Sequence, residues 1–223
     1  MLSFEQLYAH AAERKGGPEA LEALIPKPKS DRTLARITDD RWLSDMTKRV
    51  FQAGFNWKVV ENKWPGFEAA FEDFDPHAIA AYSDDDLDAL MKDTRVVRQW
   101  RKLKATRHNA QFIVDLEQEH GSAAKFFARS PSSAYVELLG TLKDRGAWMG
   151  GTTAQYFLRG MGKDSFILSK DVVKALQREK VITGSAGSKS ALNDIQQAFD
   201  QWLSEGGKSL TRVSRVLAFT VGE

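Results

Sequence analysis

Apolar residues recur along this chain with a period near 3.6, which is the period of an α-helix that buries one face. A clear case is the stripe of Trp42, Met46 and Val50 on one side of a predicted helix. No segment shows the two-residue alternation that is typical of a β-strand. The pattern therefore predicts an all-α fold.

Capping residues predict where the helices begin and end. Asp39 is expected to cap the helix that carries the Trp42 stripe, and Gly54 is expected to end it. Pro65 is expected to begin the next helix, and Ser83, which is followed by aspartates, to cap another. Further helices are predicted over residues 98–120, 123–129, 132–144, 152–161, 169–180, 189–204 and 209–218.

Composition limits the classes of protein to which this chain can belong. The chain has 223 residues, 42% of them apolar, which suits one large domain or two small lobes with a real core. Its 32 basic and 30 acidic residues nearly cancel, so any nucleic-acid surface must be a local patch. The absence of cysteine excludes disulfides and thiolate chemistry. With no signal-like start and no long apolar run, we expect a cytoplasmic protein without a membrane span.

One motif points to a specific family. Residues 52–57 read Gln-Ala-Gly-Phe-Asn-Trp, and an aromatic-rich segment that ends in Phe74-Asp75-Pro76 follows. A Gln-Ala-Gly-x-x-Trp turn before such a segment resembles the DNA-3-methyladenine glycosylase I family, in the helix-hairpin-helix DNA glycosylase superfamily. The pattern Asp93-x-x-Val96-Val97-Arg98 and the run from Met149 to Thr153 match the family in the same order.

The resemblance covers about residues 38–175 and implies an architecture. It predicts a helix-hairpin-helix DNA glycosylase-like helical bundle in two lobes. We expect an N-terminal helical extension over residues 1–37 and a glycosylase-like core over residues 38–183, with the hairpin near 145–155. The C-terminal helices, residues 184–223, are expected to pack on this core.

The resemblance also implies a base pocket at the Gln-Ala-Gly turn. Trp57 takes the family's place for the aromatic residue that stacks on the base, with Gln52 and Phe55 as walls. Adenine methylated at N3 is a cation, and a Trp face attracts it by about 1–2 kcal/mol when the pair is desolvated. The alternative is that Trp57 packs in the core.

Arg49 departs from the family pattern, because relatives carry a glutamate three residues before the position of Gln52. Asp45, one helical turn earlier, either supplies the missing carboxylate or neutralises Arg49, and a solvated salt bridge is the plainer alternative. Asp171 is a second candidate for catalysis, near the place where the superfamily often has an aspartate. Its alternative role is a first-turn acid in a helix capped by Ser169.

The Gly-Gly turn near residue 150 is the predicted DNA contact. The run Gly150-Gly151-Thr152-Thr153 would expose backbone N–H groups at a helix start, where a phosphate binds favourably, and Lys170 would add positive charge. An ordinary tight turn capped by threonine is the alternative. Similar proteins commonly hold a structural zinc, but this chain has no cysteine and its 4 histidines lack ligand spacing, so we expect no metal and no cofactor.

These expectations combine into a function. The sequence predicts a base-excision-repair DNA glycosylase, a monofunctional N-glycosyl hydrolase without lyase activity. It would flip an alkylated purine, foremost 3-methyladenine, out of duplex DNA and hydrolyse its N-glycosidic bond. Duplex DNA with damaged bases is the expected partner, and a monomer the expected state. The alternative, which Arg49 favours, is a non-catalytic or altered-specificity helix-hairpin-helix protein that binds damaged DNA; a helical interaction module unrelated to DNA is a third.

Overall fold

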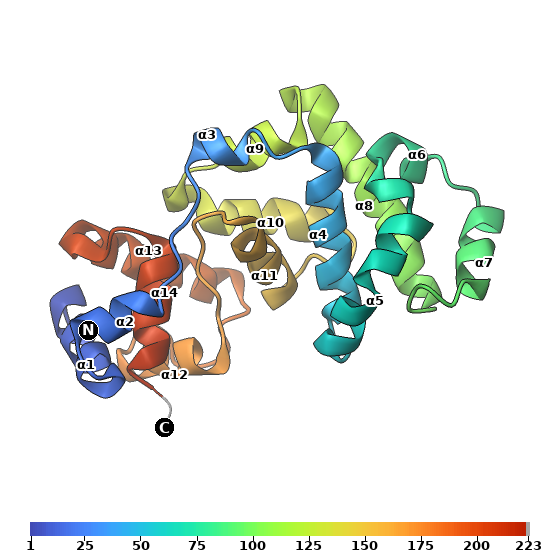
Figure 1. Ribbon diagram of the computed structural model, residues 1–223. Coiled ribbons are helices and arrows are strands. Elements are labelled where there is room, and N and C mark those ends of the chain that lie inside the picture. Colours follow the sequence, from blue (N-terminus) through green and yellow to red (C-terminus); the bar gives the residue numbers. More distant parts are fainter. Residues whose placement is uncertain (222–223) are drawn as a thin grey trace. The chain divides into compact units, whose positions relative to one another are not determined.

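The computed structural model describes residues 1–221, and over these residues the chain forms helices and turns without a β-strand (Figure 1). The predicted all-α fold is confirmed. None of the helices in residues 1–221 has the length and apolarity required to cross a membrane. Contacts between residues divide the chain into two compact units, each of which combines segments that are distant in sequence.

Unit 1 is formed by Met1–Lys29, Pro131–Leu138 and the chain from Gly162 onward. Its helices are α1 (Phe4–Lys15), α2 (Pro18–Ala23), η2 (Ser132–Ala134), the start of α10 (Tyr135–Arg145), α12 (Lys170–Arg178), α13 (Lys189–Trp202), η3 (Leu203–Gly207) and α14 (Leu210–Phe219). Its core contains large aromatic side chains that are fully buried: Tyr135, Phe166, Phe199 and Trp202.

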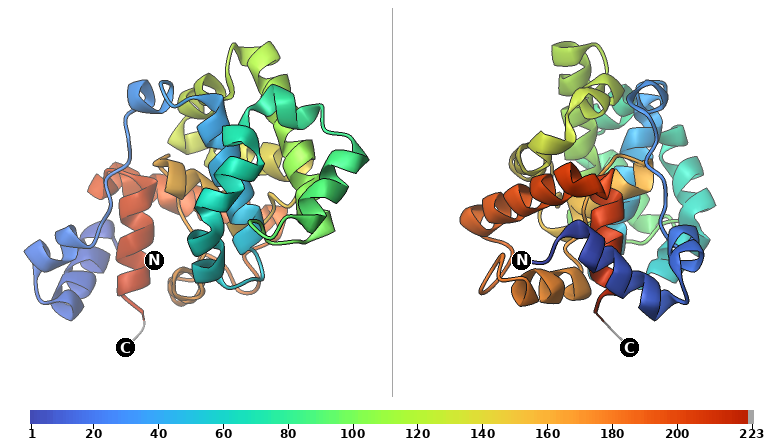
Figure 2. Two further views of the ribbon diagram at one scale, coloured as in Figure 1. Left: turned by 45° about the vertical axis from the view of Figure 1, so that its right-hand side comes forward. Right: turned by 90° about the vertical axis from the view of Figure 1, so that its left-hand side faces the viewer.

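The first residues of the chain are bonded to the C-terminal helices within unit 1. Trp202 donates its indole N–H to the carbonyl of Leu2 (3.0 Å), and the Leu2 N–H donates to Glu179 (2.8 Å). The N–H of Phe4 donates to Glu205 at 2.8 Å. Figure 2 shows α1 in blue beside α14 in red, and the two helices pack against each other. Segments from opposite ends of the sequence therefore share one core.

Unit 2 is formed by Ser30–Ser130 and Leu139–Met161. Its helices are α3 (Asp31–Leu34), α4 (Asp39–Gln52), α5 (Trp57–Ala70), η1 (Glu72–Phe74), α6 (Pro76–Ala80), α7 (Asp84–Lys92), α8 (Trp100–His120), α9 (Ala123–Arg129), the rest of α10, and α11 (Thr152–Met161). Helix α4 packs against α5, α8 and α11. Its Trp42 is fully buried and stacks on Phe127 of α9, with ring centroids 4.5 Å apart.

Asp39 does not cap its own helix, and that prediction was wrong. Thr38 precedes α4, and Asp39 is its first residue. The Asp39 carboxylate instead accepts hydrogen bonds from the N–H groups of Ala123 and Ala124, at 2.9 and 3.0 Å, and so caps α9. Burial raises the pKa of the Asp39 carboxyl. Because Asp39 and α9 are far apart in the sequence, no local sequence pattern indicates this cap.

Helix α5 does not begin at Pro65, as predicted, but at Trp57, and Pro65 lies inside it. Asn56 caps the start, because its side-chain oxygen accepts from the N–H of Lys58 at 3.0 Å. Proline has no N–H, so the helical bond from residue 65 to the carbonyl of Glu61 cannot form. Burial of the apolar side of the helix holds it together: Val60, Trp64 and Phe67.

Other helix boundaries agree closely with the sequence pattern. The predictions over 123–129 and 152–161 match α9 and α11 residue for residue. Ser83 caps α7 in a capping box with Asp86. The three predicted domain ranges stay a prediction, because compact units defined by contacts are not the same as independently folding domains.

Candidate base pocket and hairpin

The turn between α4 and α5 presents two aromatic side chains at the surface. Helix α4 ends at Gln52, and Gly54 follows with φ at +65°. A Cβ on Gly54 would meet no atom within 4 Å, so the left-handed backbone, and not space, favours glycine here. The turn leaves Phe55 46% exposed and Trp57 42% exposed. A tryptophan this accessible is available to stack on a ligand.

Trp57 is held in place by a second aromatic ring. Tyr156 of α11 contacts it edge to face, with ring centroids 5.1 Å apart and an interplanar angle of 88°. Such pairs are favourable beyond the area they bury. Tyr156 belongs to the helix that follows the predicted hairpin turn, so the predicted base pocket and the hairpin helix meet at Trp57.

Arg49 is held in an ion pair on the α11 side of α4. Its guanidinium donates to both oxygens of Asp45, Nε to Oδ2 at 3.2 Å and Nη2 to Oδ1 at 3.1 Å. Each side chain is only 17% exposed. Gly160 of α11 makes room, because a Cβ there would lie 3.0 Å from Asp45 Oδ2 and against the Arg49 guanidinium. The pair is therefore packed rather than fully solvated.

Gln52 connects Arg49 to the α5 helix. It is 2% exposed, and its Oε1 accepts from Arg49 Nη1 at 3.0 Å. Its amide nitrogen donates to Oε1 of Glu61 at 3.4 Å. The structure thus brings together Asp45, Arg49 and Gln52, as the sequence predicted, and adds Glu61, which no sequence signal indicated.

Lys102 of α8 donates hydrogen bonds to the backbone at the α4–α5 turn. Its Nζ donates to the carbonyls of Phe51 (3.0 Å) and Ala53 (2.7 Å), and burial lowers the pKa of its ammonium. The same Nζ lies 5.4 Å from the ring centroid of Trp148, which is 45% exposed in the hairpin turn. Lys102 therefore contacts both turns. One sequence signal could have indicated this role: Lys102 lies on the buried face of α8, one helical turn before Thr106.

The hairpin turn between α10 and α11 is anchored on α8. The side chain of Asn109 is fully buried, accepts from the N–H of Ala147 at 2.7 Å and donates to its carbonyl at 3.1 Å. The predicted phosphate-binding residues follow directly: exposed Gly150 and Gly151 in the turn, then Thr152 and Thr153 as the first residues of α11. Their binding of DNA stays a prediction.

Asp171 and Lys170 lie in unit 1, whereas the other predicted site residues lie in unit 2. Both are in the first turn of α12, where the side chain of Ser169 accepts from the N–H of Val172 at 3.3 Å. This is the capped helix start that the sequence offered as the alternative role for Asp171. A catalytic role for Asp171 stays a prediction.

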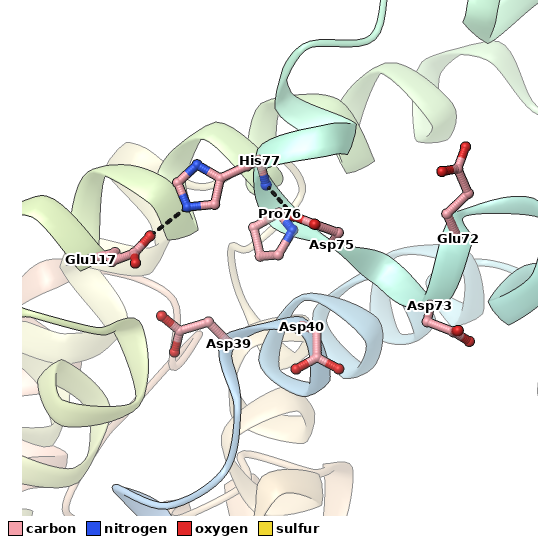
Figure 3. A pocket seen from close by; sticks show the side chains of 8 residues that line it. All are labelled: Asp39, Asp40, Glu72, Asp73, Asp75, Pro76, His77 and Glu117. Carbon is pink, nitrogen blue, oxygen red and sulfur yellow. Dashed lines mark hydrogen bonds and ion pairs between the residues drawn. The ribbon is translucent and has the colours of Figure 1, made fainter.

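An acidic cavity of about 370 Å³ lies at the N-terminal end of α4, away from the end that carries Gln52. Figure 3 shows its lining, in which the ring of His77 points to Glu117 (Nε2 to Oε2, 2.7 Å). The lining residues are Asp39, Asp40, Glu72, Asp73, Asp75, Pro76, His77 and Glu117. No group of three or more potential ligands in residues 1–221 is placed to hold a metal ion. Such an array of carboxylates repels phosphate, so the cavity is not the DNA-binding site.

Comparison with known proteins places these features in a family. A family model described as methyladenine glycosylase matches residues 35–148, about half of the chain. The chain belongs to the methyladenine glycosylase family. The matched region contains the α4–α5 turn, Lys102 and the anchor of the hairpin, and it ends before Gly150. The family resemblance inferred from the motifs is confirmed.

Individual relatives agree with this assignment. The chain is 31% identical over 130 residues to a DNA-3-methyladenine glycosylase of Haemophilus influenzae, which covers 50% of this chain and 70% of that protein. It is 34% identical over 67 residues to DNA-3-methyladenine glycosylase 1 of Escherichia coli, but the aligned region covers only 36% of that protein and 30% of this chain.

Solved structures in the family share the helical fold. A mutant of 3-methyladenine DNA glycosylase I from Staphylococcus aureus superposes with a TM-score of 0.50 at 26% identity, over 56% of this chain and 77% of that one. Another structure of the Staphylococcus aureus enzyme has a TM-score of 0.51 at 22% identity, over 70% of this chain and 91% of that one, and shows the fold alone. The predicted glycosylase-like helical fold is confirmed.

Proposed function

We propose that this protein is a monofunctional DNA glycosylase, without a lyase step, that removes 3-methyladenine from duplex DNA in base excision repair. Membership in the methyladenine glycosylase family supports this, as do relatives that are named DNA-3-methyladenine glycosylases. The observation that carries the proposal is Trp57, an exposed ring at the family's Gln-Ala-Gly turn that Tyr156 holds edge to face.

The proposed reaction needs little from the protein beyond holding the base. The damaged nucleotide is flipped out of the duplex and its purine stacks on Trp57. The bond between N9 of the purine and C1′ of the sugar breaks, and its electron pair neutralises the cationic base, which is therefore a good leaving group. Water adds to C1′ and loses a proton, which leaves an abasic site. Asp45 and Asp171 remain the proposed carboxylates for this step, although Asp45 already accepts two hydrogen bonds from Arg49.

Binding of the duplex is proposed to use the hairpin. Backbone N–H groups at the start of α11, from Gly150 to Thr153, would bind a phosphate. Lys170, which belongs to unit 1, is proposed as a separate contact with DNA. These contacts position DNA but do not read its sequence. We further propose a monomer that acts in the cytoplasm on duplex DNA containing damaged bases.

Arg49 supports a second candidate function. It places a cation next to Gln52, in the predicted base pocket, where a cationic base would be repelled if the charge were not balanced. The alternative is a helix-hairpin-helix protein that binds damaged DNA without excising the base, or that excises a different one. The bidentate pair with Asp45 balances the charge of Arg49, which favours the glycosylase.

Release of free base from methylated duplex DNA, resolved by chromatography, tests the proposal. We expect the wild-type protein to release 3-methyladenine. Trp57→Ala should lower kcat/KM by about five- to thirtyfold, the equivalent of about 1–2 kcal/mol of lost cation–π attraction and stacking. Trp57→Phe, which keeps an aromatic face, should lose less. If the protein binds methylated duplex DNA but releases no base, the result supports the alternative. Equal activity of Trp57→Ala and wild type would exclude the Trp57 pocket.

A further inference from the structure

Glu61 lies beside the candidate base pocket, on the helix that begins with Trp57. It stands four residues after Trp57, a spacing that puts two side chains on the same face of a helix, and it is exposed. Neither the sequence pattern nor the family motif singles it out.

Glu61 faces the buried amide of the pocket. The amide oxygen of Gln52 accepts from Arg49 at 3.0 Å, while the amide nitrogen donates to Glu61 Oε1 at 3.4 Å. An amide has its acceptor and its donors on opposite sides, so a cation on one side and a carboxylate on the other hold a single orientation. Gln52 therefore separates the charge of Arg49 from that of Glu61.

The carboxylate of Glu61 is not used to neutralise Arg49, and the ammonium of Lys102 is directed at the carbonyls of Phe51 and Ala53. Arg49 is neutralised by Asp45, with which it forms a bidentate pair, and Glu61 has no such ionic partner on α4. Lys63, the next basic residue along α5 after Lys58, is engaged elsewhere, since its ammonium donates to the carbonyl of Thr94 at 2.6 Å. Glu61 thus places an exposed carboxylate on the face of α5 that begins with Trp57, where it would attract a bound cation.

We propose that Glu61 is a specificity-determining residue whose carboxylate selects a cationic, N-methylated purine over a neutral one at Trp57. The inference rests on the proposed function, because it concerns the base that this site accepts. A cationic base on Trp57 gains attraction both from the ring face and from the carboxylate, whereas a neutral purine gains stacking alone.

Glu61→Gln tests the proposal, because it removes the charge and keeps the shape of an exposed side chain. Asp88→Asn is the matched control, since Asp88 is an exposed acid of α7 in the same unit and its loss changes the net charge equally. We expect Glu61→Gln to lower kcat/KM for release of 3-methyladenine by about two- to fivefold relative to Asp88→Asn. Equal rates for the two variants would overturn the proposal.

Binding of nucleosides separates this inference from the proposed catalysis. 1-Methyladenosine is a cation at neutral pH, whereas adenosine is neutral, and quenching of tryptophan fluorescence reports their binding. We expect wild type and Asp88→Asn to prefer 1-methyladenosine, and Glu61→Gln to lose this preference. If wild type releases no base but shows the preference, the glycosylase proposal fails and the role of Glu61 stands. If it releases base while Glu61→Gln keeps the full preference, the role of Glu61 is excluded.

Discussion

Lys102 is a single residue on which the shape of the α4–α5 turn depends. Its ammonium satisfies two carbonyls at the end of α4, those of Phe51 and Ala53, at a point where the helix can no longer do so. It is 6% exposed, which is rare for a lysine that forms no ion pair in the described structure. The position of Trp57, four residues after Ala53, therefore depends on a buried cation.

Substitution of Lys102 should loosen this turn. Lys102→Met keeps the apolar stem but leaves both carbonyls without their donor, at a cost of about 2–3 kcal/mol in the free energy of unfolding. Urea denaturation would measure this cost. Lys104→Met, on the exposed side of α8, is the control and should change stability by less than about 0.5 kcal/mol. An equal effect of the two substitutions would contradict the role assigned to Lys102.

The titration of Lys102 gives a second prediction. Burial lowers the pKa of its ammonium in the folded state, so between that pKa and the ordinary value of 10.5 the unfolded chain binds more protons than the folded one. The part of this group's contribution that depends on pH is complete above pH 10.5 and is lost as the pH falls through the folded pKa. The stability difference between wild type and Lys102→Met should therefore grow as the pH rises towards 10.5, and a difference that is constant or shrinks would contradict the shift.

At the scale of elements, two turns from distant parts of the sequence meet on α8. Lys102 contacts the α4–α5 turn and the ring of Trp148, and Asn109, two helical turns later, bonds both backbone groups of Ala147. The candidate base pocket and the turn before α11 thus both contact one helix. Rigid elements that carry turns position functional groups better than long loops do.

Gly150 allows the hairpin's contact with DNA to be tested by charge alone. A Cβ at this position would meet only the Lys143 side chain at 3.8 Å, an ordinary contact, and its φ is not positive. Gly150→Asp should weaken binding of undamaged duplex at low salt by about tenfold, because it places a carboxylate where we propose that a phosphate binds. Gly150→Asn, of nearly the same shape, should bind more tightly than Gly150→Asp. Equal affinity of both variants and wild type would exclude the hairpin as the phosphate site.

At the scale of the whole molecule, the two ends of the described chain stabilise one core. Glu179, with its side chain only 5% exposed, accepts from the N–H of Leu2 and from Arg178. Together with the bond from Trp202 to the carbonyl of Leu2, it joins the first residues to α12 and α13. Unit 1 therefore depends on residues that are far apart in sequence.

Glu179→Ala should destabilise unit 1 without a direct effect on base release. It removes the acceptor of the Leu2 N–H and of Arg178 Nε, whereas the other two guanidinium nitrogens keep their bonds to Thr220, so the loss should cost about 1–3 kcal/mol. Glu19→Ala, at an exposed position of α2, should cost about 0.5 kcal/mol or less. Thermal and urea unfolding would compare the variants, while activity per folded molecule should stay at the wild-type level. A cost no greater than that of Glu19→Ala would show that this contact is dispensable.

Local features of the sequence account for what could be predicted. Helices such as α7, α9 and α11 were predicted because their caps and apolar periods lie within the segments themselves. The family was recognised because the Gln-Ala-Gly turn and the pattern from Asp93 to Arg98 are short motifs with fixed spacing. The Asp45–Arg49 pair was predictable for the same reason, since its partners are one helical turn apart.

Contacts between distant residues were decided by the tertiary structure. The pairing of Asp39 with α9, the support of the α4–α5 turn by Lys102 and the approach of Glu61 to Gln52 each join elements whose separation in sequence carries no period and no motif. The sequence by itself determined the helices and the family, because both depend on residues that are close together in the sequence. Only packing determined which charges face the candidate pocket, because a side chain acquires distant neighbours when the helices come together.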